Sequence, residues 1–210
     1  MRVNVIMASY LGDYENAAGD REYKFRRAVD SFLAQGHPDK KLFIVADGCQ
    51  QTVDIINGYS ADAKLKIVCH YVPKQPLFSG SVRNAGIQDA VFDGGGIICY
   101  LDTDDVIVNT HLADISRGFE QEPGLAWVYY NDYIARSHDM SLTTMRGNMI
   151  SPGLIGTSSI AHKSDMPVRW GDGYGHDWHF VSMLQNCSSS YKQISTNSYI
   201  VCHLPQLFEF

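Results

Sequence analysis

The chain has 210 residues, of which 45% are hydrophobic and 19% are charged, and its formal net charge is −6. This composition excludes a disordered, collagen-like or coiled-coil chain, and the length suffices for one domain with a continuous core. The excess of acidic residues argues against nonspecific binding to nucleic acid or to an anionic membrane, because such binding requires a basic surface.

Five cysteines occur without CxxC spacing, and Cys69, Cys99 and Cys202 fall within apolar segments. We therefore expect reduced, buried thiols, as in a reducing compartment. The N-terminal apolar segment is too short for a secretory signal, and no segment reaches the roughly 20 apolar residues of a membrane span. These features predict a cytoplasmic location and no transmembrane segment.

Strands and helices alternate along the first half of the sequence. Apolar segments of strand length predict four buried strands, at Val3–Ala8, Leu42–Ala46, Leu65–Val72 and Ile97–Leu101. Apolar residues at helical spacing predict a helix around Phe25–Leu33 and another around Val82–Ala90. Ser79 or Ser81 is the expected N-cap of the second helix. We expect Arg21–Arg27 to form a solvent-exposed helix face.

The alternation continues in the second half, with further elements at Leu112–Phe119 (helix), Leu125–Tyr130 (strand), Trp178–Leu184 (helix) and Asn197–His203 (strand). Such a pattern predicts an α/β fold, with a mostly parallel central sheet flanked by helices. Ligands of such sheets bind beyond the carboxyl ends of the strands. The residues that follow predicted strands are therefore candidate site residues, namely Ser9–Tyr10, Asp47–Gly48 and Asp102–Asp105.

Three carboxylates, those of Asp102, Asp104 and Asp105, lie within four residues at the end of a predicted strand. If this segment is extended, Asp102 and Asp104 point to the same side and repel each other unless a cation neutralises them. Carboxylate oxygens suit Mg²⁺ or Mn²⁺, which complete their coordination with phosphate oxygens and water. The alternative is a solvated turn in which Asp105 caps the next helix.

The order of these segments resembles that of glycosyltransferase family 2, whose members have the GT-A fold and use nucleotide-diphospho-sugars. The five similar segments are Val3–Tyr10, Arg27–Gln35, Phe43–Cys49, Gly80–Ile87 and Tyr100–Asp105. The last of them resembles the family's metal-binding Asp-x-Asp signature. Cys49 stands where the family commonly has serine, and the proline usual before Ser9–Tyr10 is missing. The similarity is looser beyond residue 105.

The resemblance implies one GT-A domain over residues 1–210, with a nucleotide-sugar-binding half (1–105) and an acceptor half (106–210). Ser9 and Tyr10 would line the nucleotide pocket, and Asp47 would accept hydrogen bonds from the base. Asp102 would reach the ribose or a metal-bound water. Thr103, within the same signature, would belong to the same nucleotide-sugar-binding segment.

The resemblance also implies groups for the diphosphate and the metal. Asp104 would ligate a divalent cation, Mn²⁺ or Mg²⁺. Arg83 would lie near the phosphates or the sugar, since its planar guanidinium matches oxyanion geometry; the alternative is a structural pair with one of the acidic residues. His203, after the last predicted strand, would be a further metal ligand, and an imidazole would shift the preference towards Mn²⁺.

An inverting transferase also needs a base that takes the proton of the acceptor hydroxyl. Asp177 occupies the place of the second acid in the family's Glu-Asp pair, and His176 stands in the place of the first. The alternative for Asp177 is a carboxylate favoured by the dipole at a helix N-terminus. We further expect Asp132 near the acceptor or the donor sugar.

The predicted function is thus metal-dependent, inverting transfer of a sugar from a nucleotide-diphospho-sugar, with UDP-sugar favoured, to a glycan, lipid-linked or other hydroxyl acceptor. The alternative from another class is a non-catalytic domain that binds a nucleotide-sugar or a glycan. A sugar-phosphate nucleotidyltransferase is disfavoured, because the segment after the first predicted strand lacks that class's Gly-x-Gly-x-Arg loop.

Overall fold

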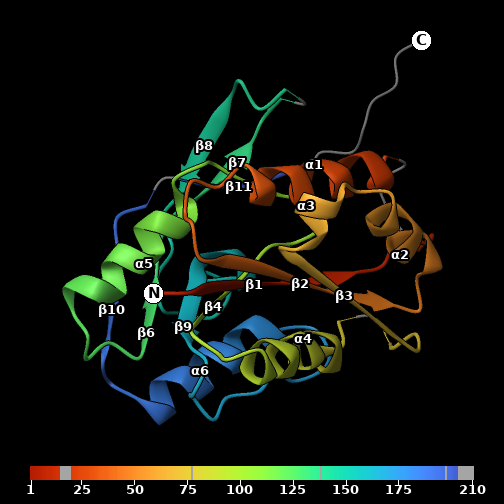
Figure 1. The fold of residues 1–210 in the computed structure, drawn as a ribbon. Helices are drawn as coiled ribbons and strands as arrows, with labels where there is room; N and C mark the ends of the chain where they lie inside the picture. Colours follow the sequence, from red (N-terminus) through yellow and green to blue (C-terminus); the bar gives the residue numbers. More distant parts are fainter. Residues whose placement is uncertain (15–19, 77, 138, 197, 203–210) are drawn as a thin grey trace.

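A seven-stranded sheet runs through the middle of the molecule (Figure 1). The computed structural model describes residues 1–14, 20–76, 78–137, 139–196 and 198–202. The strands of this sheet are β1 (Val3–Ser9), β2 (Lys40–Asp47), β3 (Ile67–Val72), β4 (Ile97–Tyr100), β6 (Trp127–Tyr129), β9 (Ile160–Lys163) and β10 (Tyr191–Gln193). Their spatial order is β10-β6-β9-β4-β1-β2-β3.

The strands β3, β2, β1 and β4 are parallel neighbours, and β9 is antiparallel to both β4 and β6. The predicted α/β fold with a mostly parallel sheet is therefore confirmed. The register pairs Ser9 of β1 with Ala46 of β2, so these strands end at the same edge of the sheet. The residues that follow them lie side by side at that edge.

Helices cover both faces of the sheet (Figure 1). They are α1 (Arg21–Leu33), α2 (Gln50–Asn57), α3 (Ala61–Lys64), α4 (Gly80–Phe92), α5 (His111–Gln121) and α6 (His176–Cys187). Successive side chains of a strand point to opposite faces. On β1, Val3, Val5 and Met7 join the core under α1, α2 and α5. Ile6 joins the second core, which contains side chains of α4 and α6.

A second, four-stranded sheet lies beside the first, and the sequence analysis did not predict it. It has the order β5-β11-β7-β8 and is formed by β5 (Val106–Ile107), β7 (Asp132–Ala135), β8 (Thr143–Arg146) and β11 (Tyr199–Val201). A short 3₁₀ helix, η1 (Thr157–Ser159), precedes β9. The predicted strand Asn197–His203 corresponds to the shorter β11, and its two end residues lie outside the described residues.

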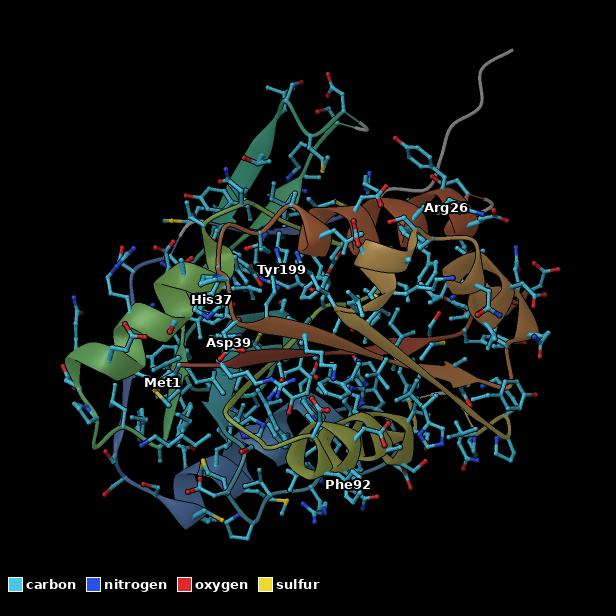
Figure 2. The ribbon with its side chains drawn as sticks, viewed as in Figure 1. Met1, Arg26, His37, Asp39, Phe92 and Tyr199 are labelled. Carbon is cyan, nitrogen blue, oxygen red and sulfur yellow. The ribbon has the colours of Figure 1, made fainter. Side chains whose placement is uncertain are left out.

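Buried and exposed side chains follow this architecture. Figure 2 shows Phe92 on the outer side of α4, where it is 95% exposed, whereas Tyr199 of β11 is fully buried. Cys99 and Cys202 are buried as predicted, and Cys69 is half-buried. No helix of the described residues is both long and apolar enough to cross a membrane.

The start of α4 is held by the loop at residues 169–173. Asn84 and Trp170 exchange two hydrogen bonds of 2.9 Å each, between the Asn84 amide and the Trp170 backbone. Ser79 is the N-cap residue of α4, one of the two predicted, but its side chain makes no capping hydrogen bond; instead the carboxylate of Asp172 accepts a 2.8 Å bond from the backbone N–H of Gly80. This contact connects the first half of the chain to the segment that precedes α6.

Replacing Gly80 with alanine should destabilise the protein. The new Cβ would lie 2.3 Å from the carbonyl oxygen of Gly171 and 2.5 Å from that of Trp170. Overpacking of this kind costs ~1–3 kcal/mol, and each kcal/mol lowers the Tm by roughly 2–4 °C in a chain of this size. The measurement is the Tm of Gly80→Ala in thermal denaturation, compared with that of the control variant Gly124→Ala. A Cβ added at Gly124 would have no neighbouring atom within 4 Å. Equal melting temperatures would contradict the close packing.

Candidate functional site

A pocket of about 430 Å³ opens at the carboxyl ends of β1 and β2. Its lining includes five residues predicted to bind the nucleotide-sugar, which are Ser9, Tyr10, Asp47, Arg83 and Thr103. The parallel sheet explains this convergence, since neighbouring parallel strands end at one edge. Ser9 contributes little surface, because it is fully buried and its hydroxyl pairs with Thr52 at 2.8 Å.

One end of this pocket is built around the carboxylate of Asp47. The Lys74 ammonium donates to Asp47 Oδ2 at 2.7 Å, and the backbone N–H of Gln75 donates to Oδ1 at 2.6 Å. The same ammonium lies 4.3 Å from the centre of the Tyr10 ring, within the range of a cation–π contact. Asp47, Tyr10 and Lys74 thus form one charged and aromatic unit.

Arg21 extends this end of the pocket, contrary to the prediction of a solvent-exposed helix face. Its guanidinium donates to the carbonyl oxygens of Tyr10 and Gly12 and lies 4.6 Å from the centre of the Tyr14 ring. Arg27 is also half-buried and donates to the carbonyl oxygen of Asp104 at 2.8 Å. Of the three arginines in this segment, Arg26 is exposed as expected.

The acidic segment Asp102–Asp105 is a turn rather than a continuation of β4, because the backbone N–H of Asp105 bonds to the carbonyl oxygen of Asp102 at 3.2 Å. The extended geometry from which we inferred that Asp102 and Asp104 share a side is therefore absent. Asp105 is 1% exposed and faces the second sheet. Its carboxylate accepts 2.9 Å and 2.8 Å bonds from the Tyr199 hydroxyl and the backbone N–H of Cys202.

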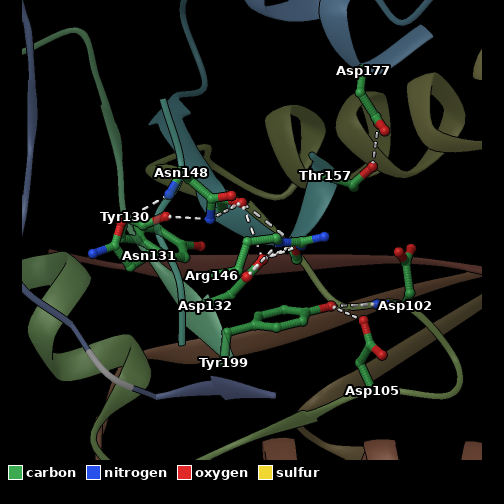
Figure 3. Close-up of polar contacts among 12 residues, drawn as sticks. Asp102, Asp105, Tyr130, Asn131, Asp132, Arg146, Asn148, Thr157, Asp177 and Tyr199 are labelled. Carbon is green, nitrogen blue, oxygen red and sulfur yellow. Dashed lines mark hydrogen bonds and ion pairs between the residues drawn. The ribbon is translucent and has the colours of Figure 1, made fainter. Parts of the chain in front are cut away.

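The Tyr199 hydroxyl also accepts a 3.1 Å bond from the backbone N–H of Asp102 (Figure 3). Tyr199 thereby holds both ends of the acidic turn, and Asp105 has a structural role. Asp102 is bound on its other side by Arg83, whose guanidinium donates to Asp102 Oδ1 at 3.2 Å. The Arg83 guanidinium also lies 5.1 Å from the centre of the Trp170 ring.

Two partly exposed carboxylates, those of Asp102 and Asp104, are the candidate metal ligands in the described part of the chain. The described residues contain no cluster of three or more His, Cys, Asp or Glu side chains that could hold a metal ion. The third predicted ligand, His203, lies outside the described residues. The donor set is chemically suitable, because Mg²⁺ and similar ions commonly take one or two protein carboxylates and complete their coordination with phosphate oxygens and water.

A second pocket of about 530 Å³ adjoins the first, and the two share Phe78 and His176 in their linings. It contains Asp177, in the first turn of α6. The Thr157 hydroxyl donates to Asp177 Oδ1 at 2.6 Å, and His176 Nε2 lies 3.3 Å from the same oxygen. Figure 3 shows Asp177 and Thr157 pointing toward each other from α6 and η1.

The hydrogen bond between His176 and Asp177 shifts the pKa values of both side chains. Burial alone would raise the pKa of the Asp177 carboxyl, but the hydrogen bonds from His176 and Thr157 outweigh it and lower that pKa. The hydrogen bond to Asp177 raises the pKa of His176 against the effect of burial. Asp177 is therefore held as a carboxylate beside an imidazole that readily carries a proton.

We expected Asp132 near the acceptor or the donor sugar. The structure places it behind the pocket wall instead, because its side chain is fully buried. It forms a two-bonded ion pair with Arg146 and accepts a 2.7 Å bond from the Ser158 hydroxyl (Figure 3). Arg146 in turn lines the second pocket. Asp132 therefore acts by fixing the guanidinium at the wall of that pocket.

Residue patterns did not indicate Arg21, Lys74 and Phe78, which line the first pocket, or Thr157, which donates a hydrogen bond to Asp177. Lys74 and Phe78 lie in an irregular segment without periodicity, so no pattern indicated them. Phe78 has a φ of 59°, a left-handed conformation that is unfavourable for a bulky residue and occurs often at functional sites. That signal belongs to the backbone geometry and cannot be read from residue types.

Comparison with known sequences gives one family match. The sequence model described as "Glycosyl transferase family 2" matches residues 20–172. No curated protein sequence matches the chain significantly.

Several solved structures share the fold of this chain. The structure of S. aureus TarS 1–349 is similar with a TM-score of 0.73 and 14% identity, covering 96% of this chain and 60% of that one. For the complex of S. aureus TarS 1–349 with UDP-GlcNAc the TM-score is 0.74 and the sequence identity 14%, and the match covers 96% of this chain and 58% of that one. For the complex of S. aureus TarS 1–349 with UDP the TM-score is 0.75 and the sequence identity 14%, and the match covers 96% of this chain and 60% of that one. The chain thus spans about 60% of TarS 1–349, and the shared fold is the GT-A fold.

Removing the Tyr199 hydroxyl should destabilise the acidic turn. Tyr199→Phe removes the 2.9 Å hydrogen bond that the hydroxyl donates to the buried Asp105 carboxylate, and a hydrogen bond to a charged group contributes ~1.5–3 kcal/mol. Urea denaturation should show this loss of unfolding free energy. The matched control is Tyr23→Phe at a 61% exposed position, which should unfold as the original protein does. A Tyr199→Phe protein as stable as the control would contradict the role of this contact.

Proposed function

The chain belongs to glycosyl transferase family 2, and we propose that it transfers a sugar from a nucleotide-diphospho-sugar, with UDP-sugar favoured, to an acceptor hydroxyl. The observation that carries this proposal is the pair of adjoining pockets that share Phe78 and His176. The first is lined by cations and aromatic rings at the strand ends, and the second contains a fixed carboxylate. Donor and acceptor would meet where the two pockets join.

The first pocket suits a nucleoside diphosphate. Arg21, Lys74 and Arg83 line it and supply positive charge for phosphate oxygens. Tyr10 offers a ring and Asp47 a carboxylate for the base. Both oxygens of the Asp47 carboxylate already accept hydrogen bonds. The nucleobase would therefore bind to these oxygens together with the Lys74 ammonium, or displace the Lys74 ammonium from them. The structures of TarS with UDP and with UDP-GlcNAc support a uridine donor for this shared fold.

We assign the divalent cation, Mn²⁺ or Mg²⁺, to Asp102 and Asp104, with His203 as a further ligand. A bound cation would offset the negative charge that develops on the leaving diphosphate. Arg83, which already contacts Asp102, would lie beside the same phosphates. Asp104 would be oriented through the backbone bond that its carbonyl receives from Arg27.

Asp177 is the proposed general base. Its Oδ1 is held by Thr157 and His176. Its Oδ2 has no hydrogen-bond partner among the described residues and remains for the acceptor. As the acceptor oxygen bonds to the anomeric carbon, the bond from that carbon to the diphosphate oxygen breaks and the hydroxyl proton moves to Asp177 Oδ2. Attack from the face opposite the diphosphate inverts the anomeric configuration.

Donor binding can be tested by thermal-shift measurements with uridine, guanosine, cytidine and thymidine diphosphate sugars, with and without Mn²⁺. We expect the largest stabilisation from a UDP-sugar with Mn²⁺, by about 2.7 kcal/mol at a ligand concentration of 100 Kd. Lys74→Met should weaken this effect, because it removes the cation between Tyr10 and Asp47. Lys66→Met, at an exposed position, is the matched control.

Asp104→Asn should abolish the additional stabilisation by Mn²⁺ and leave that by the nucleotide alone. If none of the four nucleotide-sugars stabilises the protein, the proposed donor class is wrong. If Asp104→Asn keeps the full response to Mn²⁺, the assigned metal ligand is wrong.

The base can be tested by release of UDP in the presence of an acceptor. Asp177→Asn should lower kcat by roughly 10²–10⁴-fold with donor stabilisation retained, and Asp165→Asn at an exposed position is the control. His176→Gln should raise the pKa of Asp177, since it removes the hydrogen bond that lowers it. Activity is lost when the base is protonated, so the acidic limb of the kcat/KM profile should move to higher pH.

Full activity of Asp177→Asn would exclude this residue as the base. Donor binding by the original protein without transfer to any acceptor would instead favour the alternative, a non-catalytic nucleotide-sugar-binding domain.

A further inference from the structure

A third cavity, of about 540 Å³, continues the second pocket along α6. The two share Trp178 and His179 in their linings. The third cavity ends at Ser182 and Met183, five and six residues beyond Asp177 on the same helix. At 1.5 Å per residue this is about 8–9 Å along the helix axis. We call the second pocket and this cavity together the acceptor groove.

The lining of the acceptor groove alternates between aromatic faces and polar groups. Trp178 is common to both of its parts and is half-buried, whereas Trp170 belongs to the wall of the outer part, where it is 3% exposed and stacked on Phe180. Arg146 and His179 line the inner part, and His179 and Arg169 line the outer one. A lipid tail would require a continuous apolar wall, which these side chains interrupt. A pyranose ring has an apolar C–H face and polar hydroxyls at its edge, and it matches both kinds of group.

Two exposed aromatic rings form the rim of this groove where it meets the first pocket. Tyr174 is 96% exposed and Phe78 is 55% exposed, and their ring centres are 6.3 Å apart in an edge-to-face arrangement. The backbone N–H of Gly173 bonds to the carbonyl oxygen of Phe78 at 3.1 Å and connects the two segments. The rim therefore offers ring surface to a ligand lying between the pockets.

The charge of the groove also restricts the ligand. Among the described residues that line it, Asp177 is the single carboxylate, Arg146 and Arg169 are cations, and His176 readily carries a proton. Arg146 is already paired with the buried Asp132. The cations of this lining would repel a basic peptide, whereas a neutral polyhydroxylated chain would meet no electrostatic repulsion there.

We propose that the acceptor groove binds an oligosaccharide of at least two sugar units. The unit that receives the transferred sugar lies beside Asp177, and the next unit lies on Trp178 in the outer cavity. This inference rests on the proposed function, because it takes Asp177 as the base. It adds the class of acceptor and a second acceptor subsite.

The test is binding to an array of oligosaccharides of one to six units, built from glucose, N-acetylglucosamine, galactose and mannose, without nucleotide present. Phosphatidylglycerol vesicles and a polylysine peptide serve as the competing ligand classes. We expect binding to chains of two or more units and about ten- to hundredfold weaker binding to the corresponding monosaccharide. Trp178→Ala should reduce affinity for the longer chain to that for the monosaccharide, and Trp178→Phe should restore most of it.

Tyr174→Ala, at a 96% exposed position that cannot support the core, should weaken binding of the same chain. Phe92→Ala removes an equally exposed ring on the outer side of α4 and should leave binding unchanged. Binding to vesicles or polylysine but to no oligosaccharide would overturn the proposal, and so would equal affinity of Trp178→Ala and the original protein. Because nucleotide is absent from this experiment, its failure is separate from a failure of donor stabilisation by UDP-sugars.

Discussion

Parallel pairing of β1 with both β2 and β4 is the constraint on which the rest of the structure depends. It brings the ends of three strands to one edge of the sheet, so that Tyr10, Asp47 and the acidic turn are neighbours although they are far apart in sequence. An antiparallel partner at either position would have sent one of these segments to the opposite edge. The first pocket therefore follows from strand direction before any side-chain contact is considered.

The second half of the chain completes the site through two connections to this edge. Tyr199 of β11 holds both ends of the acidic turn, and the loop at 169–173 binds the first turn of α4 through Asp172 and Trp170. The second connection sets where α6 begins, and with it where Asp177 lies relative to the first pocket. The close approach at Gly80 leaves no room for a side chain, so the two halves are held in one arrangement.

The sequence alone led to the fold class and the family, and both are confirmed. Hydrophobic periodicity located β1, β2, α1 and α4 because these elements each bury one face against a large core. It failed for most of the second sheet, because β5, β7 and β8 have at most four residues and show no clear alternation; β11 had been predicted, as the longer strand Asn197–His203. It also failed for Arg21 and Arg27, since an arginine at the edge of a helix is exposed or buried according to what packs beside it.

What the sequence determined by itself is the set of strand-end residues, because a short apolar segment followed by Asp or Tyr is a local pattern. Only the tertiary structure decided what those residues do for one another. It showed that the acidic segment is a turn in which Asp105 is buried, and that Lys74 occupies the space between Tyr10 and Asp47. It also placed Thr157 on Asp177. These outcomes depend on contacts between segments that are distant in the chain, and such contacts leave no mark in local residue order.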